Sequence, residues 1–124
     1  MNQIEQLLKD LWNKNDSISA ITVIAVSNNA ILYQTDNWDI GSDLQTVLSN
    51  WDTQRGSIEI QGIHYSTLQC TPERLVCTNV RGQGHIVASR EENILAIAYI
   101  LPNADIGASY MAIARVVDLI NKYM

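Results

Sequence analysis

The sequence predicts an α/β (α+β) domain with a central antiparallel sheet of five to six strands and helices on both faces. Three segments repeat apolar residues at helical spacing, one at each end of the chain and one near residues 40–51. Between them lie apolar, β-branched runs separated by turn-forming residues, which are typical of strands. With 124 residues, of which 47% are apolar, the chain is expected to form one domain over residues 1–124. The predicted order is helix, two strands, helix, three or four strands, helix.

The first helix and two strands are expected within residues 2–35. Polar residues 13–17 end the helix. The nearly continuous apolar run at residues 18–26 is typical of a strand buried on both faces. Asn28 and Asn29 favour a two-residue hairpin turn before a strand at residues 30–35. The helical stripe comprises Ile4, Leu7, Leu8, Leu11 and Trp12.

The second helix begins at Asp39 or Ser42, which are both favourable capping residues. Acidic residues surround this helix with no base between them. Trp38 precedes the apolar stripe, so its side chain is a candidate for exposure. The stripe comprises Ile40, Leu44, Val47, Leu48 and Trp51.

An antiparallel meander is expected from residue 57 to residue 101. Ile58 and Ile60 alternate with polar residues, and Gly62 then interrupts the pattern as a bulge or a tight turn. Residues 57–70 therefore form either a hairpin or one long bulged strand, and the sequence leaves both open.

The later strands are expected at residues 75–80, 85–89 and 94–101. The last of them is the most apolar, so we expect it at the centre of the sheet. Asn103 or Asp105 caps a final helix.

Composition and charge exclude several classes of function. Thirteen acidic against eight basic residues give a net charge of −5, which disfavours nucleic-acid binding. The longest apolar run, residues 94–101, is far shorter than the ~20 residues that span a bilayer. No signal-peptide pattern is present, so we expect a cytoplasmic protein without direct membrane insertion. Cys70 and Cys77 are expected as small core residues, and whether they are adjacent stays open.

Three segments carry a resemblance to a known family. Residues 18–35 (ISAITVIAVSNNAILYQT), residues 75–100 (LVCTNVRGQGHIVASREENILAIAYI) and residues 102–107 (PNADIG) resemble the roadblock/dynein light chain family, within the profilin-like and longin-like fold group. The resemblance implies a non-enzymatic dimeric scaffold or regulator of a small Ras-like GTPase. The partners it implies are a second copy or a paralogous roadblock domain, together with the GTPase, which would recruit the chain to intracellular membranes.

The resemblance also implies where a dimer would form, on the second helix and the strand that follows it. A strand at a sheet edge has unpaired backbone groups that another chain can satisfy. The expected dimer interface comprises Gln45, Thr46, Ser49, Asn50, Ile58 and Ile60.

A separate surface is expected to bind a partner. Arg74, Arg81 and Arg90 are spaced through the meander and are separated from the acidic second helix, so they either balance the acidic charge or form a basic docking patch for an acidic partner. Trp38, if exposed, is the best candidate for an interface anchor.

No catalytic, cofactor-binding or metal-binding residue is assigned. Residues 81–85 contain two glycines but lead into a strand, whereas a phosphate cradle needs a helix behind the loop. His64 and His85 lack metal-ligand spacing, and no nucleophile elbow is present. One alternative is a profilin-like protein that binds actin-type monomers or proline-rich peptides. This function needs an exposed aromatic groove between the terminal helices, to which Trp12 and Tyr123 are candidate contributors, although Trp12 also fits the core stripe of its helix. A second alternative is a small-ligand sensor or enzyme with a concave polar site.

Overall fold

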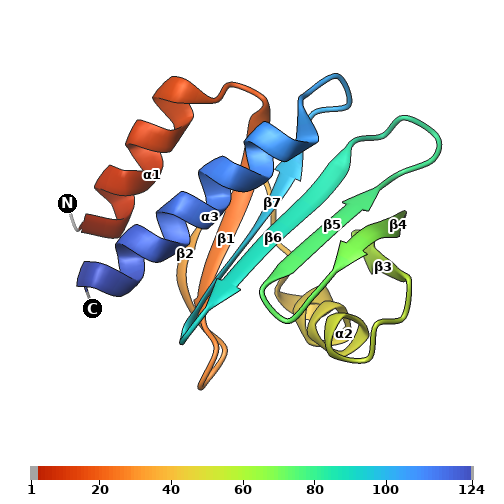
Figure 1. The fold of residues 1–124 in the computed structure, drawn as a ribbon, viewed down its shortest axis with the longest axis horizontal. Helices are drawn as coiled ribbons and strands as arrows, with labels where there is room; N and C mark the ends of the chain where they lie inside the picture. Colours follow the sequence, from red (N-terminus) through yellow and green to blue (C-terminus); the bar gives the residue numbers. More distant parts are fainter. Residues whose placement is uncertain (1–2, 124) are drawn as a thin grey trace.

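The computed structural model describes residues 3–123, with side chains for residues 4–122. Within this range the strands form one sheet of seven strands in the order β2-β1-β7-β6-β5-β4-β3, with every neighbouring pair antiparallel (Figure 1). The predicted fold class is confirmed. The elements are α1 (Gln3–Lys14), β1 (Ile18–Ala25), β2 (Ala30–Gln34), α2 (Gly41–Asp52), β3 (Ser57–Ile60), β4 (Ile63–Cys70), β5 (Arg74–Thr78), β6 (His85–Glu91), β7 (Ile94–Ile100) and α3 (Ile106–Tyr123).

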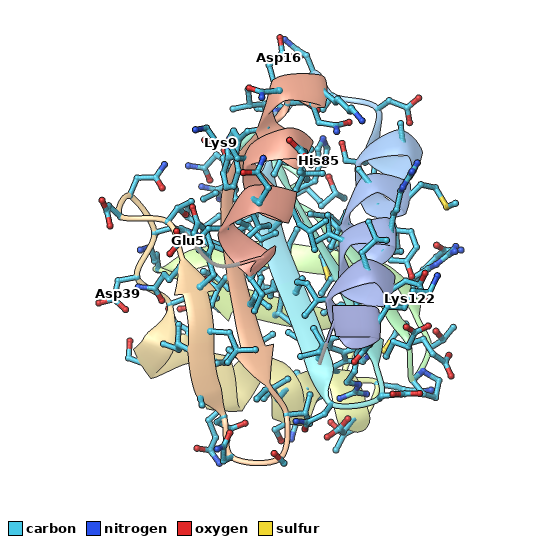
Figure 2. All side chains as sticks on the ribbon, turned by 90° about the vertical axis from the view of Figure 1, so that its left-hand side faces the viewer. Glu5, Lys9, Asp16, Asp39, His85 and Lys122 are labelled. Carbon is cyan, nitrogen blue, oxygen red and sulfur yellow. The ribbon has the colours of Figure 1, made fainter. Side chains whose placement is uncertain are left out.

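Helices cover both faces of the sheet, as predicted. The terminal helices α1 and α3 lie side by side on one face, where Leu8, Ile113 and Val117 are buried against the strands (Figure 1, Figure 2). On the opposite face α2 buries Leu44 and Val47 in a second cluster. Full burial of such a side chain contributes about 1.5–3 kcal/mol relative to its exposure, so these two clusters hold the layers together.

Strand β7 lies in the interior of the sheet, between β1 and β6. Consecutive residues Ile94, Leu95, Ala96 and Ile97 are all buried, because helices or loops cover both faces of this strand. The expectation that the most apolar strand is central is confirmed.

The stretch from residue 57 to residue 70 is a hairpin, which resolves the two alternatives that the sequence leaves open and adds a seventh strand. Gln61 and Gly62 form its turn with φ values of 52° and 79°, and Ile60 pairs with Ile63. The turn is tied to the start of α2, because the Gln61 backbone N–H donates to Asp43 Oδ2 at 2.9 Å. The interruption at Gly62 is therefore a tight turn.

The first hairpin turn is longer than the sequence predicts. β1 ends at Ala25, which pairs with Ala30, so residues 26–29 form the turn instead of Asn28 and Asn29 alone. The cause is a tertiary contact: the backbone N–H groups of Val26 and Ser27 donate to the carbonyl and side-chain oxygens of Asn93 at 2.8 and 2.7 Å.

The final helix is capped by Asp105, one of the two predicted residues. Its Oδ1 accepts a hydrogen bond from the Ala108 backbone N–H at 3.0 Å. In the described part of the chain, no helix has both the length and the apolar character needed to cross a membrane.

Candidate protein interface

One face of the sheet is only partly covered by helices. The helices α1 and α3 cover β1, β7 and β6, whereas β5, β4 and β3 extend beyond them (Figure 1). On the other side of these three strands, α2 packs against Ile58, Tyr65 and Cys77. Because side chains alternate along a strand, the intervening residues of β3–β5 point to the side of the sheet on which α1 and α3 lie. Of these residues, Val76 is buried in the core with α3, and the polar residues farther from α3 are not covered by a helix.

The strand register shows which side chains share this side. Glu59 lies opposite His64, Ser66 opposite Thr78, and Thr78 opposite His85. We call this surface, together with the adjoining residues of β4 and β5, the open sheet face. It comprises Glu59, His64, Ser66, Gln69, Arg74, Thr78 and His85.

Arg74 marks the border between the open sheet face and α3. Its guanidinium carbon lies 4.2 Å from the ring centroid of Tyr110, and Nη1 donates to Gln69 Oε1 at 3.3 Å. A guanidinium over an aromatic ring is held by the negative ring face. Arg74 is therefore held against Tyr110 of α3, and its charge is positioned before any partner arrives.

His85 is held at both ring nitrogens. Nε2 lies 3.0 Å from the Pro102 carbonyl oxygen and Nδ1 lies 2.8 Å from Thr78 Oγ1. A carbonyl can only accept, so Nε2 carries the hydrogen and, in the neutral ring, Nδ1 accepts from the Thr78 hydroxyl. These two contacts fix the ring, so this part of the face is rigid.

Apolar side chains lie next to this polar surface. Leu68, at the bulge in β4, is 56% exposed. Val80, which is 79% exposed, projects from the loop between β5 and β6. Asn79 organises that loop, because its Nδ2 donates to the His64 carbonyl at 2.8 Å while its Oδ1 accepts from the Arg81 N–H at 2.8 Å. Polar groups bordered by exposed apolar side chains on a rigid frame are typical of a protein-binding surface.

The predicted partner-binding residues are not brought together. Trp38 is only 5% exposed and packs in the core beneath α2, so the expectation of an exposed anchor is corrected. Arg90 points to the α2 face, where its guanidinium lies 4.2 Å from the Trp51 ring centroid. Arg74 points to the opposite face, and exposed Arg81 lies in the β5–β6 loop. The three arginines therefore form no single basic patch.

The residues expected at a dimer interface divide into two groups. Gln45, Thr46 and Ser49 are on the outer side of α2, and Asn50 donates from Nδ2 to the Ser57 carbonyl at 3.3 Å. The side chains of Ile58 and Ile60 are buried in the core, so β3 offers a second chain only its backbone edge. The assignment of these residues to an interface stays a prediction.

A groove of about 730 Å³ separates α1 and α3 on their outer side. Its described lining is mostly apolar and contains no aromatic side chain; the polar and charged residues in it are Asp10, Lys14, Asn15, Arg115 and Asp118. Trp12 lies on another side of α1, where its ring centroid is 6.4 Å from that of Tyr33. The Tyr123 side chain lies outside the described residues. The aromatic groove expected between the terminal helices is thus not formed by Trp12.

The buried thiol has the properties of a core residue. Cys77 and Cys70 are free and are not opposite each other, since Cys77 pairs with Thr67 and Cys70 with Leu75. Burial raises the pKa of the Cys77 thiol to about 11, so it stays protonated at neutral pH. Among the described residues, no cluster of three or more His, Cys, Asp or Glu side chains is placed to hold a metal ion.

The sequence does not predict the open sheet face as a site. It indicates His64 and His85 only as sheet residues, because nothing in the sequence tells which half of the sheet the terminal helices cover. The available signal is the alternation of Ile58 and Ile60 with Glu59, which shows that one side of this region is polar.

Comparison with known proteins identifies relatives along most of the chain. No family model matches the sequence. Odin profilin from Odinarchaeota yellowstonii is 35% identical over 108 residues, covering 86% of this chain and 88% of the relative. Loki profilin-2 from Lokiarchaeum is 35% identical over 92 residues, covering 68% of each chain. Among solved structures, Loki profilin-2 in its complex with rabbit actin matches with a TM-score of 0.89 and 26% identity over 100% of both chains.

The roadblock family assignment is wrong. A Roadblock/LC7 domain from Streptomyces avermitillis matches with a TM-score of only 0.58 and 12% identity, over 96% of this chain and 99% of that domain, which shows a similar fold alone. The predictions that depended on this assignment are therefore also wrong, namely the GTPase-regulator function, the roadblock dimer and the GTPase partner. The profilin-like alternative fits the relatives better. The archaeal relatives are 35% identical to this chain where they align and cover more than two thirds of it, so the chain belongs to the profilin family.

Proposed function

We propose that this chain is a non-enzymatic protein that binds an actin-type monomer, and that the open sheet face is the surface that contacts it. The observation that supports the proposal is the uncovered half of the sheet beside α3, in a fold that matches a profilin solved together with actin. A rigid frame supports binding because little side-chain entropy is lost on association. Arg74 and His85 are already held in place before a partner arrives.

An actin-type monomer is a better candidate for this chain than a proline-rich peptide. Recognition of proline-rich segments depends on grooves lined with aromatic side chains. The described lining of the groove between α1 and α3 offers aliphatic side chains and Met111 instead.

The test is a titration of monomeric rabbit actin with the full chain, measured by isothermal titration calorimetry. The variant His64→Glu places a carboxylate in the middle of the open sheet face, opposite Glu59. The new carboxylate repels Glu59, which lies directly opposite it, so the side chains of this surface must rearrange. A partner that covers the new carboxylate must also remove its hydrating water. We expect binding to weaken roughly tenfold or more.

The matched control is Gln45→Glu, which adds the same charge on the exposed surface of α2, on the other face of the sheet. This variant is expected to bind as the original chain does. Absence of binding by the original chain would refute actin as the partner. Equal effects of the two variants would refute the open sheet face as the contact surface.

A further inference from the structure

A small pocket lies on the α2 side of the sheet, whereas the open sheet face is on the side of α1 and α3. The volume of the pocket is about 210 Å³, and Trp38, Tyr65 and Tyr99 are among the residues that line it. All three side chains belong to the core cluster beneath α2 or pack against it, so they lie on the same side of the sheet. The pocket is therefore separate from the surface proposed for actin.

Three aromatic rings form the walls of this pocket. Tyr65 is 2% exposed and Trp38 is 5% exposed, so the core holds both rings in place. The Tyr99 ring lies 2.6 Å from the position of a Cβ added at Gly84, and its hydroxyl donates to the Gln83 carbonyl at 2.7 Å. Fixed aromatic walls favour a planar ring as the occupant, because aromatic rings attract one another in tilted or offset arrangements. The volume is sufficient for one ring, since a cavity of about 150 Å³ holds benzene.

The Tyr65 hydroxyl has no hydrogen-bond partner among the described residues. Burial and then the charge of Tyr99 raise the pKa of Tyr65 to about 12, and no hydrogen bond contributes to this shift. The phenol is therefore protonated at neutral pH and has a hydrogen to donate. In the described part of the chain, the unpartnered side-chain atoms that are closed to solvent are Thr22 Oγ1 and Gln34 Oε1, so the Tyr65 hydroxyl is open to solvent. Because the rest of this side chain is buried and it lines the pocket, its hydroxyl opens into the pocket.

Two side-chain amides lie at the rim of the pocket. Asn37 Nδ2 donates to the Ser19 carbonyl at 3.3 Å, and Gln61 Nε2 donates to the Asp39 carbonyl at 3.2 Å. These bonds fix the amide nitrogens and leave the amide oxygens as acceptors. No charged side chain is among the described lining residues, so a charged ligand would lose its hydrating water without gaining a counter-charge.

We propose that this pocket binds an uncharged ring that carries a hydroxyl group, namely a phenol. The ring packs against Trp38 and Tyr99. Its hydroxyl accepts a hydrogen bond from Tyr65 and donates one to the amide oxygen of Asn37 or Gln61. A phenol reaches the chain either as a free small molecule or as a tyrosine side chain of another polypeptide, and the chemistry of the pocket is the same for both. This inference does not depend on actin binding, and its test contains no actin.

The test is an NMR titration of the isotope-labelled full chain with p-cresol, toluene and 4-methylbenzoate at neutral pH. Toluene has the ring of p-cresol without the hydroxyl, and 4-methylbenzoate has the same ring with a negative charge. With p-cresol we expect a saturable shift of the Trp38 indole N–H and an affinity roughly two- to tenfold higher than that of toluene, because one hydrogen bond is gained. We expect no binding of 4-methylbenzoate.

The other two indoles serve as internal controls. Trp12 packs with the core on the α1 side of the sheet, and Trp51 donates its indole N–H to the Thr71 carbonyl at 2.6 Å, at the other end of β4 from the pocket. Both signals should stay unchanged. Acetyl-tyrosine amide, run in parallel, distinguishes the two sources of the phenol. Tighter binding than p-cresol assigns the pocket to a tyrosine side chain of a polypeptide, and weaker binding assigns it to a free phenol.

Two variants that each remove one hydroxyl test the role of Tyr65. Tyr65→Phe keeps the ring, so it should lower the affinity for p-cresol roughly two- to tenfold and leave the affinity for toluene unchanged. Tyr33→Phe removes a hydroxyl on the α1 side of the sheet and should leave both affinities unchanged. The proposal is overturned if the Trp38 indole does not shift with p-cresol, if toluene or 4-methylbenzoate binds as well as p-cresol, or if the two variants behave alike.

Discussion

Replacement of Gly84 by alanine is expected to destabilise the fold for two separable reasons. Gly84 adopts a φ of +107°, which L-residues rarely occupy, and holding alanine there costs about 1–3 kcal/mol. A Cβ at this position would also lie 2.6 Å from the ring and hydroxyl atoms of Tyr99. Tyr99 must then move and release its 2.7 Å hydrogen bond to the Gln83 carbonyl, which is worth about 0.5–1.5 kcal/mol. Together these effects give a loss of about 1.5–4.5 kcal/mol.

Urea unfolding measures this loss, and Gly82 provides the matched control. Gly82 has a φ of +79°, but no atom lies within 4 Å of the position that an added Cβ would take, so Gly82→Ala should lose only the about 1–2 kcal/mol due to backbone strain. In a Tyr99→Ala background the clash is absent, so Gly84→Ala should cost only its backbone strain and less than it costs in the original chain. If Gly84→Ala is no worse than Gly82→Ala in the original chain, the reasoning about Tyr99 is refuted.

Three further perturbations test the burial of a core side chain, the pKa of a buried tyrosine and the cap of a helix. Ile58→Ala should cost about 2–5 kcal/mol of unfolding free energy, because the side chain is buried beneath α2, whereas Ile31→Ala at a 48% exposed site should cost far less; equal losses would contradict the assigned burial. Desolvation, followed by the charge of a neighbouring tyrosine, raises the pKa of Tyr65 from 10.0 to about 12, so the folded state favours the protonated phenol. The contribution of the Tyr65 phenol to the free energy of unfolding is complete below pH 10 and is lost between pH 10 and about 12, by up to about 3 kcal/mol. In Tyr65→Phe the free energy of unfolding should therefore change less with pH over this range. Asp105→Ala removes the cap of α3 and should lower the unfolding free energy by about 1 kcal/mol, whereas Asp105→Asn should retain most of it.

The parts of the fold that follow from local periodicity could be predicted from the sequence. The apolar stripe of α3 predicts a helix that is buried on one side. The continuous apolar run of β7 predicts a strand that is covered on both faces. Asp105 as a cap follows equally from the chemistry of its side chain.

The parts that depend on distant contacts could not be predicted. Trp38 lies outside any periodic stripe, and its burial depends on how α2 and β7 come together. The length of the first hairpin turn depends on Asn93, which is remote in sequence from that turn. The side of the sheet to which Arg74 and Arg90 point follows from strand register, which the sequence pattern alone leaves undetermined.

The family assignment failed for a related reason. The order of helices and strands is shared by related folds, so it does not separate a roadblock domain from a profilin. The structure separates them by the extent of the match, with a TM-score of 0.89 to Loki profilin-2 against 0.58 to the roadblock domain. The β3–β4 hairpin, which supplies Glu59 and His64 to the open sheet face, is the element that the sequence leaves open.

The most direct test of actin binding at the open sheet face is hydrogen–deuterium exchange of the full chain with and without monomeric rabbit actin. We predict slower exchange in β3, β4, β5 and the start of β6 when actin is added, with α2 unchanged. Slower exchange confined to α2, or to the groove between α1 and α3, would contradict the open sheet face as the binding surface.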